Sequence, residues 1–81
     1  DYPDASIRAE EQGLSVIRYS IGPDGRVVKG SCAIAQSSGF ARLDNRACEL
    51  AERRFRFNPA LSNGQPTTDQ RTQRIRWQLP K

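Results

Sequence analysis

The strongest turn signal in the chain is the tetrapeptide Gly-Pro-Asp-Gly at residues 22–25. Residues 14–21 before it and residues 27–36 after it both show the alternation of an extended strand. Two such segments joined by a short turn predict an antiparallel hairpin. The apolar side chains expected on the faces of this hairpin are Ile17, Tyr19, Ile21, Val28, Cys32 and Ile34.

A helix is predicted after this hairpin, over residues 40–56, where apolar residues recur at spacings of three and four. The hydroxyls of Ser37 and Ser38 are suited to cap its start, and Pro59 disfavours helical geometry at the residue before it. Asp44 is expected away from the apolar stripe, where it suits the helix dipole. The residues of the stripe are Phe40, Leu43, Ala47, Leu50, Ala51 and Phe55. The side chains of the helix and hairpin that we predict to be buried together are Ile17, Tyr19, Ile21, Ile34, Leu43, Ala47, Leu50, Ala51 and Phe55.

Two further elements are predicted near the ends of the chain. Residues 2–12 consist mostly of good helix formers and predict a short helix that stops at Gly13. Residues 70–79 alternate apolar and polar side chains and predict a strand. Residues 58–69 between the main helix and this strand are expected to be a polar connection.

The order helix, strand, strand, helix, strand limits the topology. If the third strand lies beside the first, every neighbouring pair is antiparallel, and this arrangement also permits the favoured right-handed crossover. We therefore predict an α+β fold, in which a three-stranded antiparallel sheet of order 2-1-3 carries one main helix and a short N-terminal helix. In this arrangement the last strand is an exposed edge.

Composition limits the size and setting of the domain. The chain has 81 residues, of which 36% are hydrophobic, and it has no methionine and six aromatic side chains. A single domain over residues 1–81 with one sheet and one covering helix suits this inventory. No apolar run reaches the roughly 20 residues of a membrane span, and no signal peptide is recognised. Because the chain opens on Asp1 rather than methionine, we expect a fragment of a longer protein.

The reactive side chains disfavour an enzyme. The absence of histidine removes Ser-His and Cys-His nucleophiles and a Cys2His2 zinc site, so no catalytic residue, metal site or cofactor is predicted. Cys32 and Cys48 remain as either a buried free pair or a disulfide. We favour the disulfide because a bridge of this loop size stabilises a small domain by about 3 kcal/mol, and it implies an oxidising compartment.

The charge leaves a second class of function open. The net charge is +4, and eleven of the thirteen basic residues are arginine, which binds carboxylates and phosphates in a planar, bidentate way. A small basic nucleic-acid-binding domain is therefore the alternative hypothesis, with Phe55, Phe57 and Trp77 available for base stacking. Against it, these aromatic residues fall on the predicted core faces, and a disulfide disfavours a cytosolic role.

Several short motifs, in order along nearly the whole chain, resemble the C-terminal domain family of TonB, the periplasmic energy transducer of Gram-negative bacteria. Each motif is weak alone, and their order and spacing carry the resemblance. The motifs are Tyr2-Pro3, Gly13, Pro23-Asp24-Gly25-Arg26-Val27, Ser37-Ser38-Gly39, Leu43-Asp44, Ala47, Arg54-Phe55-Arg56-Phe57-Asn58-Pro59-Ala60 and Gly64-Gln65-Pro66. Two departures are Ser6, where many members have alanine, and the cysteine pair, which resembles that of some variants and favours the disulfide.

The resemblance implies a non-catalytic periplasmic adaptor. Members of the family are anchored in the inner membrane, are coupled through their N-terminal region to a proton-driven motor complex, and energise nutrient uptake, for example of siderophores or metal chelates. Their C-terminal domain binds the TonB box of outer-membrane transporters by strand addition. A homodimer, formed by edge pairing or by strand exchange, is left open. The transporter-binding residues implied here are Arg71, Thr72, Gln73, Arg74, Ile75, Arg76, Trp77, Gln78 and Leu79.

Overall fold

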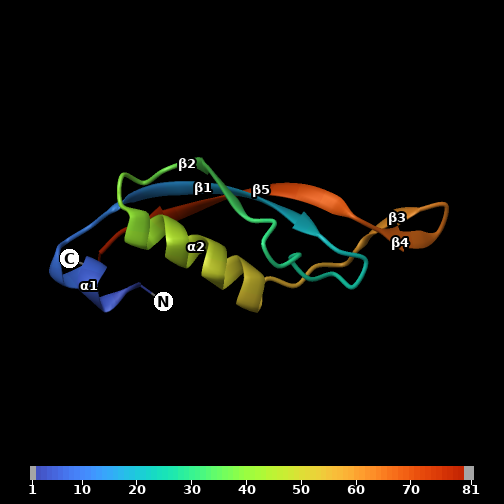
Figure 1. Ribbon diagram of the computed structural model, residues 1–81, viewed down its shortest axis with the longest axis horizontal. Coiled ribbons are helices and arrows are strands. Elements are labelled where there is room, and N and C mark those ends of the chain that lie inside the picture. The colour runs from blue at the N-terminus through green and yellow to red at the C-terminus, as the bar shows by residue number, and fades with distance from the viewer. Residues whose placement is uncertain (1, 80–81) are drawn as a thin grey trace.

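The computed structural model describes residues 2–79, which form two helices and five strands (Figure 1). In chain order the elements are α1 (Asp4–Arg8), β1 (Gly13–Ile21), β2 (Ala33–Gln36), α2 (Ala41–Arg54), β3 (Ala60–Ser62), β4 (Gln65–Thr67) and β5 (Asp69–Trp77). The molecule is elongated, with extents of 49 × 21 × 19 Å. Among these residues, neither helix has the length and apolar character needed to cross a membrane.

The main sheet has the strand order β2-β1-β5, and both pairings are antiparallel. The predicted α+β fold with a 2-1-3 sheet is therefore confirmed. The β1–β5 pairing runs without interruption from Gly13 opposite Trp77 to Ile21 opposite Asp69. The shorter β1–β2 pairing contains a register shift between Val16 and Ile17. Helix α2 lies along one face of the sheet (Figure 1).

The core forms where alternate residues of β1 meet the apolar stripe of α2. Its buried side chains are Ile17, Tyr19, Ile21, Val27, Leu43, Ala47, Ala51 and Trp77. Of the residues predicted to be buried, Leu50 and Phe55 are half-buried. Ile34 is 39% exposed, contrary to the prediction, because it lies on the edge strand β2, which has a strand neighbour on one side.

The second strand of the predicted hairpin is much shorter than expected. An isolated bridge pairs Val27 with Ile21, but regular pairing resumes only at Ala33. Between them the Ser31 hydroxyl accepts the Ser20 amide hydrogen at 3.1 Å, in a place where a regular ladder would use a backbone carbonyl. The strand predicted over residues 27–36 is therefore present only over residues 33–36, because this side chain replaces part of the ladder.

The connection after α2 contains a second, separate hairpin made of β3 and β4. It extends from one end of the molecule (Figure 1). Its turn is formed by Asn63 and Gly64, with φ values of 52° and 79°. Positive φ at both central residues is the requirement of the tight hairpin turn that Asn-Gly favours. The polar connection predicted over residues 58–69 therefore contains a short hairpin that was not predicted.

Both helices are shorter than predicted. The α1 helix ends at Arg8, and Glu10 adopts a φ of 55°. The amide of Glu11 then donates to the carbonyl of Ser6, and that of Glu10 to Ile7, which is the Schellman arrangement with glutamate in the left-handed position. The helix thus ends well before Gly13, and α2 ends at Arg54 rather than near Arg56.

Candidate functional site

The candidate site is the free edge of β5. This strand has β1 on one side, and none of residues 2–79 pairs with its other side. It is nine residues long and has no bulge in its pairing with β1. A long edge of unpaired backbone groups is a ready template for an additional strand.

The hydrogen bonds of Ser20 show which backbone groups of β5 face outward. The Ser20 carbonyl accepts from the Val28 amide at 2.9 Å, and its amide donates to the Ser31 hydroxyl, so both groups point away from β5. Ser20 and Gln70 therefore form a non-hydrogen-bonded pair. Alternation along the continuous register then directs the amides and carbonyls of four residues to the free edge: Gln70, Thr72, Arg74 and Arg76.

The register also divides the side chains of β5 between the two faces of the sheet. Residues directly opposite each other in an antiparallel pair place their side chains on the same face. Ser15, Ile17 and Tyr19 of β1 are buried on the face that α2 covers. Their partners on β5 lie on this face, and the alternate residues lie on the outer face. The former are Ile75, Gln73 and Arg71, and the latter are Gln70, Thr72, Arg74 and Arg76.

The predicted binding residues 71–77 thus all lie on β5, while Gln78 and Leu79 follow the strand. The strand begins one residue earlier than predicted, at Asp69, and it does not extend to Leu79 as predicted. After Trp77 the chain leaves the ladder, because the Leu79 amide donates to the side-chain carbonyl of Gln12 at 3.0 Å. Edge pairing is therefore available over residues 69–77.

Asp44, which was expected to lie away from the apolar stripe, is buried, and its carboxylate fixes the Trp77 end of β5. Asp44 is 6% exposed and its Oδ1 accepts hydrogen bonds from the Ser15 hydroxyl at 2.7 Å and the Ser38 amide at 2.9 Å. The hydroxyls of Ser38 and Ser37 also donate to this carboxylate. The Trp77 indole N–H in turn donates to Ser15 Oγ at 3.1 Å. One network therefore joins α2, β1 and β5.

The charge state of Asp44 follows from these contacts. Burial by itself raises the pKa of the Asp44 carboxyl, but the donors on Ser37, Ser38 and Ser15 outweigh burial and hold the pKa below its ordinary value. The predicted capping of α2 by serine hydroxyls takes a different form. These hydroxyls bind the Asp44 side chain, and the N-cap residue of α2 is Phe40.

Segment 2–12 packs against the same end of the sheet. The Tyr2 ring meets Trp77 edge-on at a centroid distance of 5.2 Å, and its hydroxyl donates to the Glu11 carbonyl. Arg42 of α2 binds the Glu11 carboxylate at 2.6 Å, and this hydrogen bond lowers the pKa of Glu11. The Trp77 end of β5 thus packs against Tyr2, which is bound to the loop after α1, and Arg42 joins this loop to α2.

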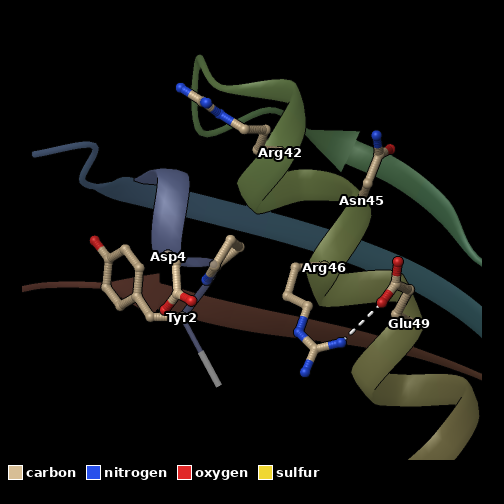
Figure 2. A pocket seen from close by; sticks show the side chains of 7 residues that line it. Tyr2, Asp4, Arg42, Asn45, Arg46 and Glu49 are labelled. Atoms are coloured by element: carbon tan, nitrogen blue, oxygen red, sulfur yellow. Dashed lines mark hydrogen bonds and ion pairs between the residues drawn. The ribbon is translucent and has the colours of Figure 1, made fainter. Parts of the chain in front are cut away.

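A hollow between α1 and α2 is a weaker candidate site (Figure 2). Its two guanidinium groups already bind carboxylates, since Arg42 pairs with Glu11 and Arg46 with Glu49 at 2.8 Å. The hollow therefore offers no uncompensated cation to a ligand. Elsewhere in residues 2–79, no group of three His, Cys, Asp or Glu side chains is placed to hold a metal ion.

The other edge of the main sheet, at β2, is attached to α2 by a covalent bond. A disulfide joins Cys32, which immediately precedes β2, to Cys48 of α2, with the two Cα atoms 5.7 Å apart. Of the two alternatives that the sequence left open for these cysteines, the structure contains the disulfide. It ties the start of the edge strand β2 to the helix that covers the sheet.

The fold and its free edge define a class of small α+β domain with a 2-1-3 sheet and a nine-residue edge strand. The chain belongs to the TonB C-terminal family, because the family described as Gram-negative bacterial TonB protein C-terminal matches residues 1–79. The resemblance drawn from the sequence motifs is thus confirmed.

Individual relatives agree with this assignment. The chain is 41% identical to Protein TonB of Neisseria gonorrhoeae over 51 residues, which are 63% of this chain and 17% of that protein. It is 43% identical to Protein TonB of Neisseria meningitidis serogroup C over 51 residues, which are 63% of this chain and 18% of that protein. The matched region is thus less than a fifth of the length of these relatives.

Proposed function

We propose that the chain is a non-catalytic periplasmic domain that binds the TonB box of outer-membrane transporters by adding it as a strand beside β5. The observation that carries the proposal is the free edge, where the backbone groups of Gln70, Thr72, Arg74 and Arg76 face outward in an unbroken register. Strand addition derives its affinity from main-chain hydrogen bonds and its selectivity from alternate side chains. Membership of the TonB family supports this use of the edge.

The remainder of the proposal concerns the whole protein. In it, residues 1–81 are one domain of a longer chain anchored in the inner membrane. An N-terminal region outside this sequence contacts a proton-driven motor complex, and the domain transmits that energy to the transporter for uptake of nutrients such as siderophores or metal chelates. The disulfide supports an oxidising location such as the periplasm.

The aromatic side chains weigh against the nucleic-acid alternative. Trp77 is 6% exposed, and the rings of Phe55 and Phe57 pack against Tyr19 at centroid distances of 5.9 and 6.0 Å. Arg71 lies over the Phe57 ring at 5.5 Å. Base stacking needs exposed ring faces, and these rings are engaged within the domain.

Pairing of two copies through β5 is the competing use of the edge. An antiparallel β5–β5 pair would bring the arginines of one copy close to those of the other, and like charges opposite each other destabilise a sheet. Charged side chains on an edge strand also limit self-association. We therefore expect the free domain to be a monomer, which sedimentation at several concentrations would test.

The proposed function is tested by NMR titration of the domain with a TonB-box peptide from a transporter of the same bacterium. We expect the largest amide shifts in β5, led by Thr72, Arg74 and Arg76, and modest affinity, because the peptide loses conformational entropy on binding. A scrambled peptide of the same composition is the control. Shifts confined to α2, with β5 unchanged, would contradict the proposal. Oligonucleotide binding that weakens steeply with salt would instead support the nucleic-acid alternative.

A further inference from the structure

The two faces of the main sheet differ in charge. Asp69 is the only acidic residue in β1, β2 and β5, and its register opposite Ile21 places it on the face that α2 covers. There its carboxylate approaches Arg71 Nε at 3.4 Å. The outer face of the sheet therefore receives no carboxylate from its own strands.

Three cations lie on this outer face. Arg74 and Arg76 are exposed and stand opposite Val16 and Leu14, and Arg18 is exposed and stands opposite Thr72. Arg18 and Arg74 are diagonal neighbours across the β1–β5 pair, a geometry within reach of long side chains. The repulsion among these like charges is relieved when an anion binds, so the outer face favours a partner with carboxylates.

The outward backbone groups belong to the same residues. Arg74 and Arg76 direct their backbone amides and carbonyls to the free edge and their side chains to the outer face. In an added antiparallel strand, the residues hydrogen-bonded to them are two positions apart, and their side chains lie on the same face as the arginines. Opposite charges at such cross-strand positions stabilise the pair.

The face toward α2 has a different character. Beside β5 it carries the half-buried Ile75, and a shallow hollow opens there next to Gln73. The other residues that line this hollow are Arg54, Phe55, Arg56 and Phe57. The intervening side chains of an added strand point to this face, where the half-buried rings favour apolar groups.

We propose that the segment bound at β5 carries carboxylates at two positions, i and i+2, opposite Arg74 and Arg76, with an apolar residue between them. This inference rests on the proposed strand addition and adds to it the chemistry that the edge selects. Arg74 and Arg76 are then specificity-determining residues, and Arg18 reinforces them from the neighbouring strand.

The test uses two short synthetic peptides of identical composition and the intact domain. In one, two glutamates alternate with valines, and in the other the glutamates are adjacent, so that only one can lie on the outer face. We expect the alternating peptide to bind about three- to tenfold more tightly at low salt. The preference should shrink as the ionic strength rises. NMR shifts of the β5 amides give both the location and the affinity.

Matched variants separate local pairing from long-range attraction. Arg74→Gln/Arg76→Gln and the control Arg8→Gln/Arg53→Gln each lower the formal net charge from +4 to +2. All four side chains are exposed, so we expect both variants to fold, as their thermal melts would show. The preference for the alternating peptide should vanish in the first variant and persist in the control.

The outcomes distinguish this inference from the proposed function. If β5 amides shift with both peptides but no preference exists, or if the preference survives Arg74→Gln/Arg76→Gln, strand addition stands and the charge selection is wrong. If neither these peptides nor a TonB-box peptide shifts β5, the proposed function and this inference both fall. A single-stranded oligonucleotide that displaces the alternating peptide from β5 at equal concentration would assign the arginines to phosphate and overturn the inference.

Discussion

The two edges of the main sheet differ in length, regularity and the way they are held. The β2 edge has four residues, a register shift and a disulfide immediately before it. The β5 edge has nine residues in unbroken register, with the Asp44 network at its Trp77 end. Short and bulged edge strands discourage pairing, whereas long regular ones invite it. One sheet thus contains a protected edge and an available one.

The disulfide next to β2 and the hydrogen bonds at the Trp77 end of β5 hold the two edge strands in different ways. The Cys32–Cys48 bridge restrains the chain where the β1–β2 ladder is weakest, next to the Ser31 side chain that replaces a backbone partner. The hydrogen bonds between Trp77, Ser15 and Asp44 instead position β5 from the face that α2 covers. They do not use the outward amides of Thr72, Arg74 and Arg76, so β5 is fixed in place without losing its capacity to pair.

The largest expected effect comes from removing the covalent attachment. The variant Cys32→Ser/Cys48→Ser should lose about 3 kcal/mol of unfolding free energy, because the bridge spans a sequence separation of 16. Urea denaturation measures the loss, and amide exchange should increase in residues 28–36 more than in β5. Intact mass after alkylation of the unreduced protein is the control. Two reactive thiols there would contradict the assigned role of the bridge.

Proline substitution at adjacent positions of β5 tests the assignment of its inward and outward amides. Gln73→Pro removes an amide directed at Ile17 of β1 and should cost about 2–3 kcal/mol of stability. Thr72→Pro removes an outward amide, so it should retain most of the stability and lose peptide binding. Thermal melts and NMR titration measure the two effects. The reverse outcome would show that the pairing is shifted by one residue.

Acidification should weaken the hydrogen bonds that join Asp44, Ser15 and Trp77, and it should leave the disulfide intact. Because hydrogen bonds lower the pKa of Asp44 in the folded state, its contribution is fully present above the ordinary carboxyl pKa near 4 and is lost as the pH falls through the lower folded value. Asp44→Asn should cost about 1–2 kcal/mol at neutral pH. The unfolding free energy of this variant should also fall less steeply than that of the unchanged protein when the pH is lowered below about 4. An equally steep fall in both proteins, measured by urea denaturation at several pH values, would contradict the role of the carboxylate.

The features that could be predicted from the sequence are those that several residues in a regular pattern indicate together. The alternation around Tyr19, the stripe of α2 and the right-handed crossover were enough to predict the 2-1-3 sheet and its free edge. The position of β5 as an edge followed from topology alone. The direction of its individual amides did not, because it depends on the hydrogen bonds of Ser20 in the folded structure.

Most of the features that were not predicted depend on partners far away in the chain. Asp44 resembles an ordinary first-turn acid, and one of the donors that satisfy its buried carboxylate, Ser15, lies 29 residues earlier. The half-length of β2 likewise depends on the Ser31 hydroxyl. The Asn63-Gly64 pair, in contrast, is a dipeptide that favours tight hairpin turns, and it is a local signal for the small β3–β4 hairpin.

The smallest predicted effect compares one side chain at each edge. Trp77→Phe retains an aromatic ring but removes the N–H that donates to Ser15, so it should cost about 1 kcal/mol. Ile34→Val on the exposed β2 edge should cost no more than about 0.5 kcal/mol. Thermal melts of the two variants, beside Ser15→Ala as a partner for a double-mutant cycle, would measure the difference. If Trp77→Phe is additive with Ser15→Ala, the hydrogen bond does not couple the strands, and β5 is held by its ladder and packing alone.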